Sequence, residues 1–157
     1  MAKYIHGAYR SDYSKESGQV KAFLIHELVH VWQYQLNILN PVLAAIAENI
    51  SHAFDYAKAY KYTLTVDKDI LDYEIEQQAA IIEDYYLIYI AGLLPVRGHM
   101  QNTLKEVKNK QLLHMQHKVL SKFILNPAFA KHVIECKKKN YGPPSQRRLR
   151  CRKVLQS

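Results

Sequence analysis

The chain has 157 residues, of which 48% are hydrophobic, and these values suit one ordinary domain with a hydrophobic core of its own. Its longest apolar stretch, residues 85–95, is much shorter than the roughly 20 residues that span a bilayer, so we expect no transmembrane segment. Residues 1–7 contain no apolar run of the kind found in export signals, so we expect no standard signal peptide.

The formal net charge of +8 is divided unevenly along the chain. Residues 1–96 contain 7 Lys and Arg against 12 Asp and Glu, a net charge of −5, whereas residues 97–157 contain 15 against 2, a net charge of +13. This division predicts a domain over residues 1–96, a basic helical extension over residues 97–139 and a basic, disordered tail over residues 140–157. The basic region suits an anionic partner such as nucleic acid, a membrane surface or the acidic domain itself, or it is a solvated lysine-rich surface.

The first predicted element is a helix over residues 19–36, where apolar side chains recur at helical spacing. It contains the motif HExxH, with His26 and His30 one turn apart and Glu27 beside the first histidine. Two histidines at this spacing project from the same face of a helix and can bind one metal ion, which for this motif is zinc. Glu27 is then placed to act as general base on a water at the metal, so the motif indicates hydrolytic chemistry.

The elements that follow are shorter and more mixed. Trp32 and Gln33 are expected to pack the motif helix against the rest of the domain. Pro41 opens an apolar segment, residues 42–47, that we interpret as a second helix or a covering loop. Residues 60–66 are aromatic and β-branched, which favours an extended segment, so the predicted fold is mainly α with a small edge β element.

A long helix is predicted over residues 70–91, with Asp67 or Asp69 as its N-cap and Gly92 at its end. Its apolar side chains form one stripe, made of Ile75, Ala79, Ile82, Tyr86 and Tyr89. This helix is the one that we expect to pack against the motif helix.

Two further helices are predicted in the basic region, over residues 100–125 and 128–138. Both cysteines, Cys136 and Cys151, lie in this region and do not form a CxxC pair, so they either make one disulfide or stay reduced.

A catalytic zinc needs a third protein ligand besides the two histidines. The HExxHxxGxxH class is excluded, because residues 33 and 36 are Gln and Leu. The alternative is a glutamate from the 70–91 helix, and we favour Glu76, although helix geometry alone does not separate it from Glu74. The competing interpretation is a solvated acidic first turn that interacts with the helix dipole.

Other residues are candidates for supporting roles. A carboxylate such as Glu83 or Asp84 is expected to hold the zinc-binding histidines in place, with a surface salt bridge as the alternative for either residue. Peptide hydrolysis also needs a donor that stabilises the oxyanion. The candidates are Tyr62, His99, His114 and His117, and the sequence favours none of them.

Three stretches of the sequence carry a resemblance to a known family. They are FLIHELVHVWQ at residues 23–33, YKY at residues 60–62 and EQQAAIIEDY at residues 76–85. Together they resemble a family of bacterial zinc-peptidase-like domains that accompany, or are fused to, the spike (Vgr) proteins of type VI secretion systems. The resemblance covers about residues 4–95, and the basic region lies outside it.

The resemblance implies a zincin-like fold similar to that of gluzincin metallopeptidases, in which the HExxH helix packs against a glutamate-bearing helix. It implies His26, His30 and Glu76 as ligands of Zn²⁺ and Glu27 as the catalytic base.

The resemblance further implies a zinc metallopeptidase that acts as an effector toxin on a protein or peptide substrate, with a spike protein and an immunity protein as partners. Such an effector needs no signal peptide, because the secretion machine delivers it from the bacterial cytoplasm to the recipient cell. The alternative function is a non-catalytic binding module whose basic C-terminal region binds nucleic acid or an acidic protein.

Overall fold

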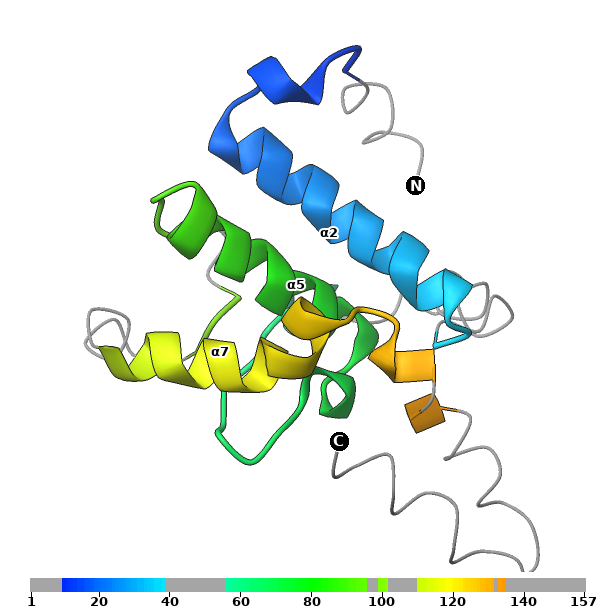
Figure 1. Ribbon diagram of the computed structural model, residues 1–157. Coiled ribbons are helices and arrows are strands. Elements are labelled where there is room, and N and C mark those ends of the chain that lie inside the picture. Colours follow the sequence, from blue (N-terminus) through cyan, green and yellow to red (C-terminus); the bar gives the residue numbers. More distant parts are fainter. Residues whose placement is uncertain (1–9, 39–55, 96–98, 102–109, 132, 135–157) are drawn as a thin grey trace, which may run out of the picture.

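The computed structural model describes residues 10–38, 56–95, 99–101, 110–131 and 133–134. This part of the chain is mainly helical, as predicted, and contains no strand (Figure 1). Its elements are the 3₁₀ turns η1 (Tyr13–Lys15) and η2 (Ile70–Asp72), the α-helices α2 (Gly18–Gln35), α4 (Tyr56–Ala59), α5 (Ile75–Tyr85) and α7 (Lys110–Leu125), and the π-helical turn η3 (Tyr86–Ile90). None of the helices in these residues is both long enough and apolar enough to cross a bilayer.

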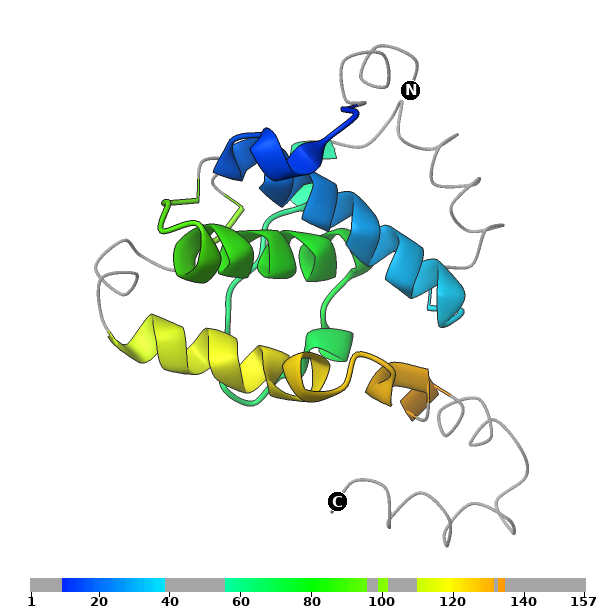
Figure 2. The ribbon, with the colours of Figure 1, turned by 45° about the horizontal axis from the view of Figure 1, so that its top comes forward.

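Helix α5 lies between α2 and α7 in both views of the ribbon (Figures 1 and 2). It runs antiparallel to α2. The start of α2 is close to the chain that follows η3, since a Cβ atom on Gly18 would lie 2.6 Å from Cδ1 of Leu93. The end of α2 is close to the start of α5, where Nε2 of Gln33 donates to the carbonyl of Ile75 at 2.9 Å.

Both ends of α2 are capped by its own sequence. Ser17 is the N-cap, and its hydroxyl accepts a hydrogen bond from the amide three residues later. At the other end Asn37 adopts a left-handed conformation with φ of 55°, and its amide and the next one donate back to carbonyls of the last turn. The helix therefore ends close to the predicted residue.

The buried face of α2 differs from the apolar stripe that locates the helix in the sequence. Three large apolar side chains of that stripe are exposed: Leu28, Val31 and Tyr34. The buried residues are instead Ala22, His26, Val29 and Gln33. Two of these are polar, and they can be buried because α5 supplies them with partners.

Helix α5 is buried on almost every side, with all seven residues from 78 to 84 buried. The single apolar stripe predicted for it is too narrow, because a helix between two others buries more than one face. The core around it includes side chains from α2, from the segment after α4 and from α7, among them Val29, Leu64, Leu112, Val119 and Leu120.

The long helix predicted over residues 70–91 is interrupted. Asp69 caps the short turn η2, and the next two residues, Tyr73 and Glu74, are extended before α5 begins. The amide of Glu74 donates to Oε1 of Gln77 at 3.1 Å, which forms a new helix start. The helical periodicity on which the prediction rests does not detect this second capping contact.

The aromatic segment 60–66 forms one parallel bridge in place of a strand, between Tyr62 and Met100. The amide of Tyr62 donates to the carbonyl before Met100 at 3.0 Å, and its carbonyl accepts from the amide after Met100 at 2.8 Å. Because Met100 takes part in this bridge, the prediction of a helix over residues 100–125 is wrong at its start.

Several predicted features lie outside the described residues: the segment 42–47, both cysteines, the tail 140–157 and much of the region 97–139. Of the helix predicted over 128–138, residues 128–131 and 133–134 are described; residue 128 lies in a turn and the others are helical. The division into domains stays a prediction.

Gly92, which follows η3, has a positive φ of 65°, and a Cβ atom built there meets nothing within 4 Å. We therefore expect Gly92→Ala to lower the free energy of unfolding by about 1 kcal/mol, through backbone strain alone. Gly92→Asn should cost less, because asparagine tolerates the left-handed region better. Urea unfolding of the two variants measures this difference, and an unchanged midpoint for Gly92→Ala would contradict it.

Candidate metal centre

Three side chains predicted to bind a metal lie together between α2 and α5. Oε2 of Glu76 lies 3.4 Å from Nε2 of His26 and 3.3 Å from Nε2 of His30. One ligand atom from each residue can be chosen so that all three lie within 4.8 Å of one another. The three residues could therefore hold one metal ion.

The start of α5 distinguishes the two candidate ligands Glu74 and Glu76. Glu74 is the N-cap of the helix and its side chain is exposed. Glu76 lies in the first turn of α5 and is directed toward the two histidines of α2. Of the two glutamates that helix geometry left open, Glu76 is the one beside the histidines.

The two distances from Glu76 to the histidines are compatible with a metal ion bound between them. Nitrogen and carboxylate ligands bind zinc at about 2.0–2.1 Å, so two of them at a tetrahedral angle lie about 3.3–3.4 Å apart, close to the distances of Glu76 from the histidines. Oε2 of Glu76 is buried, and no described residue donates a well-formed hydrogen bond to it. A cation between the three side chains would satisfy this oxygen.

The other ring nitrogen of each histidine also has a partner. Nδ1 of His26 lies 3.0 Å from Oε2 of Glu83, and Nδ1 of His30 lies 2.8 Å from Oε1 of Gln33. Both partner atoms are oxygens that accept hydrogen bonds and so favour a proton on each Nδ1; in its neutral form each imidazole then presents its lone pair at Nε2. This arrangement is the one that a metal bound at Nε2 requires.

The two carboxylates expected to support the histidines differ in what they contact. Glu83 is the one beside His26. Asp84 accepts a hydrogen bond from the hydroxyl of Tyr62 at 2.6 Å, and both of these residues are buried. Adjacent residues on α5 thus face different neighbours, one at the metal-binding group and the other in the core.

The protonation of the group reflects its mutual contacts. Burial acts to lower the pKa of His26, but contact with the carboxylates of Glu76 and Glu83 outweighs burial and raises this pKa to about 9. Burial acts to raise the pKa of Glu76, but the two facing histidines outweigh burial and lower this pKa to about 2. In the metal-free chain at neutral pH the group therefore holds an ionised carboxylate against a protonated imidazole.

Glu27, the predicted catalytic base, is exposed on α2. It follows His26 directly, so it lies about 100° around the helix from that residue. The side chain is therefore exposed to solvent, on the residue next to one of the candidate ligands.

The four candidate oxyanion donors are not equivalent. Tyr62 donates its hydroxyl to Asp84, and burial raises its pKa well above the usual value. His114 and His117 are exposed on α7. His99 is buried, and its ring stacks on that of Tyr60 with 5.2 Å between the ring centroids. The centroid of the Tyr60 ring lies in turn 5.6 Å from that of the His26 ring. Of the four candidates, His99 is the one linked to the group by ring contacts, and Tyr60 is a neighbour that the sequence reasoning missed.

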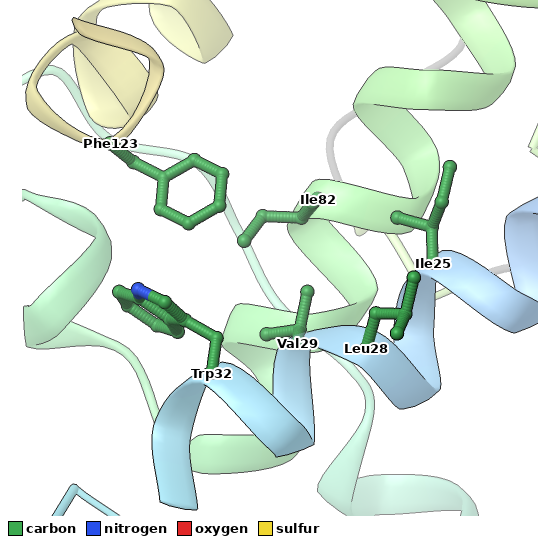
Figure 3. A pocket seen from close by; sticks show the side chains of 6 residues that line it. All are labelled: Ile25, Leu28, Val29, Trp32, Ile82 and Phe123. Carbon is green, nitrogen blue, oxygen red and sulfur yellow. The ribbon is translucent and has the colours of Figure 1, made fainter. Parts of the chain in front are cut away.

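A different face of α2 carries an apolar pocket of about 260 Å³. Figure 3 shows the side chains that line it, which come from α2, α5 and α7: Ile25, Leu28, Val29, Trp32, Ile82 and Phe123. Trp32 packs edge to face on Phe123 and donates its indole N–H to the carbonyl of Pro127 at 2.9 Å. The expected packing role of Trp32 is thus confirmed.

Comparison with known proteins gives one partial match of interest. The chain is 40% identical over 77 residues to the type VI secretion system spike protein VgrG2b of Pseudomonas aeruginosa. The match covers 49% of this chain and 7% of the length of that protein. No protein-family model matches the chain, and no solved structure matches it.

We expect the stability of the metal-free chain to depend on pH through this group. The raised pKa of His26 contributes stability that is complete below its ordinary value of 6.5 and is lost as the pH rises to about 9. The lowered pKa of Glu76 contributes stability above 4.5 that is lost as the pH falls to about 2. The free energy of unfolding should therefore fall by about 3 kcal/mol between pH 6.5 and 9.

Urea unfolding in the presence of a chelator measures this dependence. The matched control is His26→Gln, which cannot be protonated and should show a flatter profile over the same range. Equal slopes for the variant and the wild type would contradict the assignment to His26.

Proposed function

We propose that this chain is a zinc-dependent metallopeptidase with a zincin-like site, in which His26, His30 and Glu76 bind Zn²⁺. The observation that carries the proposal is the convergence of two Nε2 atoms and one carboxylate oxygen at ligand spacing, from two packed helices. Contacts at both Nδ1 atoms support it, because they leave the metal-facing nitrogens unprotonated when the imidazoles are neutral.

In peptide hydrolysis the residues around the metal would have different roles. Zinc held there would supply a Lewis acid that polarises a peptide carbonyl and makes water a stronger acid. Glu27, which is exposed and follows His26 directly, would take the proton of the attacking water and return it to the leaving amine. Glu83 and Gln33 would hold the rings of His26 and His30 in orientation.

We propose further that the peptidase is an effector associated with type VI secretion and acts on a protein of a recipient cell. The similar Pseudomonas protein is a type VI secretion system spike protein, which supports this setting. A spike protein would be its partner during delivery, and an immunity protein would protect the producing cell. In this proposal the chain leaves the bacterial cytoplasm with the secretion machine and reaches the recipient cell.

The purified wild-type chain should contain about one zinc per molecule, measured by inductively coupled plasma mass spectrometry. His26→Ala and Glu76→Gln should lose it, because each removes a ligand. Glu74→Gln is the matched control, since it changes an exposed carboxylate on the same helix and should keep the zinc. Absence of zinc from the wild type after reconstitution would overturn the proposal and direct attention to the basic C-terminal region.

Glu27→Gln should abolish peptide hydrolysis, with a loss of at least about 10²-fold, while zinc content and the circular dichroism spectrum stay unchanged. The amide is close in size to the carboxylate but cannot accept a proton. Cleavage of a proteome-derived peptide library, read by mass spectrometry, provides the assay, and Glu74→Gln again serves as control. Wild-type cleavage by Glu27→Gln would contradict the assigned base.

A further inference from the structure

Two glutamines of the sequence motifs are buried at the contact between α2 and α5. Gln33 follows the HExxH motif and is 0% exposed, and Gln78, on α5, is 3% exposed. A primary amide buried without partners costs several kcal/mol, so its hydrogen bonds determine how it can sit. The orientations of both amides can be worked out from these partners.

The orientation of Gln78 is fixed from the backbone. Its Nε2 lies 2.7 Å from the carbonyl of Tyr73, which can only accept, so Nε2 is the donor and Oε1 is left facing Gln33. Tyr73 is extended, in the interruption between η2 and α5. The interruption therefore supplies the carbonyl that anchors Gln78.

The orientation of Gln33 is fixed twice. Its Nε2 donates to Oε1 of Gln78 at 3.1 Å and to the carbonyl of Ile75 at 2.9 Å. Its Oε1 is left to face Nδ1 of His30 at 2.8 Å. An acceptor at this position requires a proton on Nδ1 of His30, since two facing acceptors would repel.

We propose that Gln78 and Gln33 are positioning residues that act through His30: together they keep the proton of its neutral ring on Nδ1 and its lone pair on Nε2, toward the metal. This inference rests on the proposed function, for which it supplies the ligand tautomer. His26 is oriented differently, by direct contact of its Nδ1 with the carboxylate of Glu83. An anionic acceptor fixes one histidine, and a chain of two neutral amides anchored on backbone carbonyls fixes the other.

The first test compares two replacements of Gln33 by their zinc affinity, measured by competition with a chelator. Gln33→Met keeps the length of the side chain without any hydrogen bond and should weaken binding about 10- to 100-fold. Gln33→Glu keeps an acceptor beside Nδ1, and burial favours its protonated form, whose hydroxyl can donate to the carbonyl of Ile75 in place of the amide. It should therefore bind zinc more tightly than Gln33→Met. If Gln33 only fills space in the core, the order reverses, because methionine packs there better than a buried carboxyl group.

The second test does not depend on zinc. In the metal-free Glu76→Ala variant no carboxylate competes for Nε2 of His30, so Gln33 alone should place the proton on Nδ1. Long-range ¹H–¹⁵N spectra of the histidine-labelled chain at about pH 8.5, roughly two units above the ordinary histidine pKa, report which nitrogen carries it. Addition of Gln33→Met should move the proton to Nε2, and a proton on Nε2 with Gln33 present would overturn the inference.

The two tests separate the possible failures. One possible result is that the wild type binds no zinc, while the proton of His30 lies on Nδ1 and depends on Gln33. The proposed function is then wrong, and the positioning role of Gln33 and Gln78 stands. If the wild type binds zinc but Gln33→Met binds it as tightly as the wild type, the positioning role of Gln33 and Gln78 is wrong and the proposed function stands.

Discussion

The contact between α2 and α5 buries polar side chains from both helices, and these side chains find their partners across the contact. His26 meets Glu76 and Glu83, while Gln33 meets Gln78 and the start of α5. A buried polar group left without a partner costs about 1–3 kcal/mol, so these pairs also fix how the helices slide and rotate against each other. The interactions that form the candidate metal centre are thus the ones that set the register of the fold.

Helix α2 is held on two faces by different kinds of contact. Its polar face meets α5 through the histidines and Gln33, whereas Trp32, on a different face of α2, lies against Phe123 and Pro127. The apolar contact comes from α7, within the basic part of the chain that has no counterpart in the family resemblance. Rigid support of this kind matters for a metal site, because ligands must be held close to their binding geometry before the ion arrives.

Much of the fold could be predicted from local pattern, and the misses have identifiable causes. The range of α2 is close to the prediction, because Ser17 and Asn37 cap the helix within a few residues of its ends. The interruption before α5 was missed, because it depends on the capping contact between Glu74 and Gln77 and leaves apolar spacing unchanged. The exposure of apolar residues on α2 and the burial of α5 on almost every side could not be predicted either, since both depend on where a third helix packs.

The sequence by itself determined the local chemistry of the centre. His26 and His30 share a helix face with Glu27 beside them, because the spacing of one helical turn requires nothing beyond the helix. Only the tertiary structure decided between Glu74 and Glu76, and between Glu83 and Asp84, and it alone brought Gln33 and Gln78 together. Neighbouring residues on a helix point about 100° apart, so a choice between them depends on where the helix starts and how it is rotated against its partner. The capping contact between Glu74 and Gln77 sets the start of α5, and contacts between distant segments set its rotation. Periodicity along one segment contains neither.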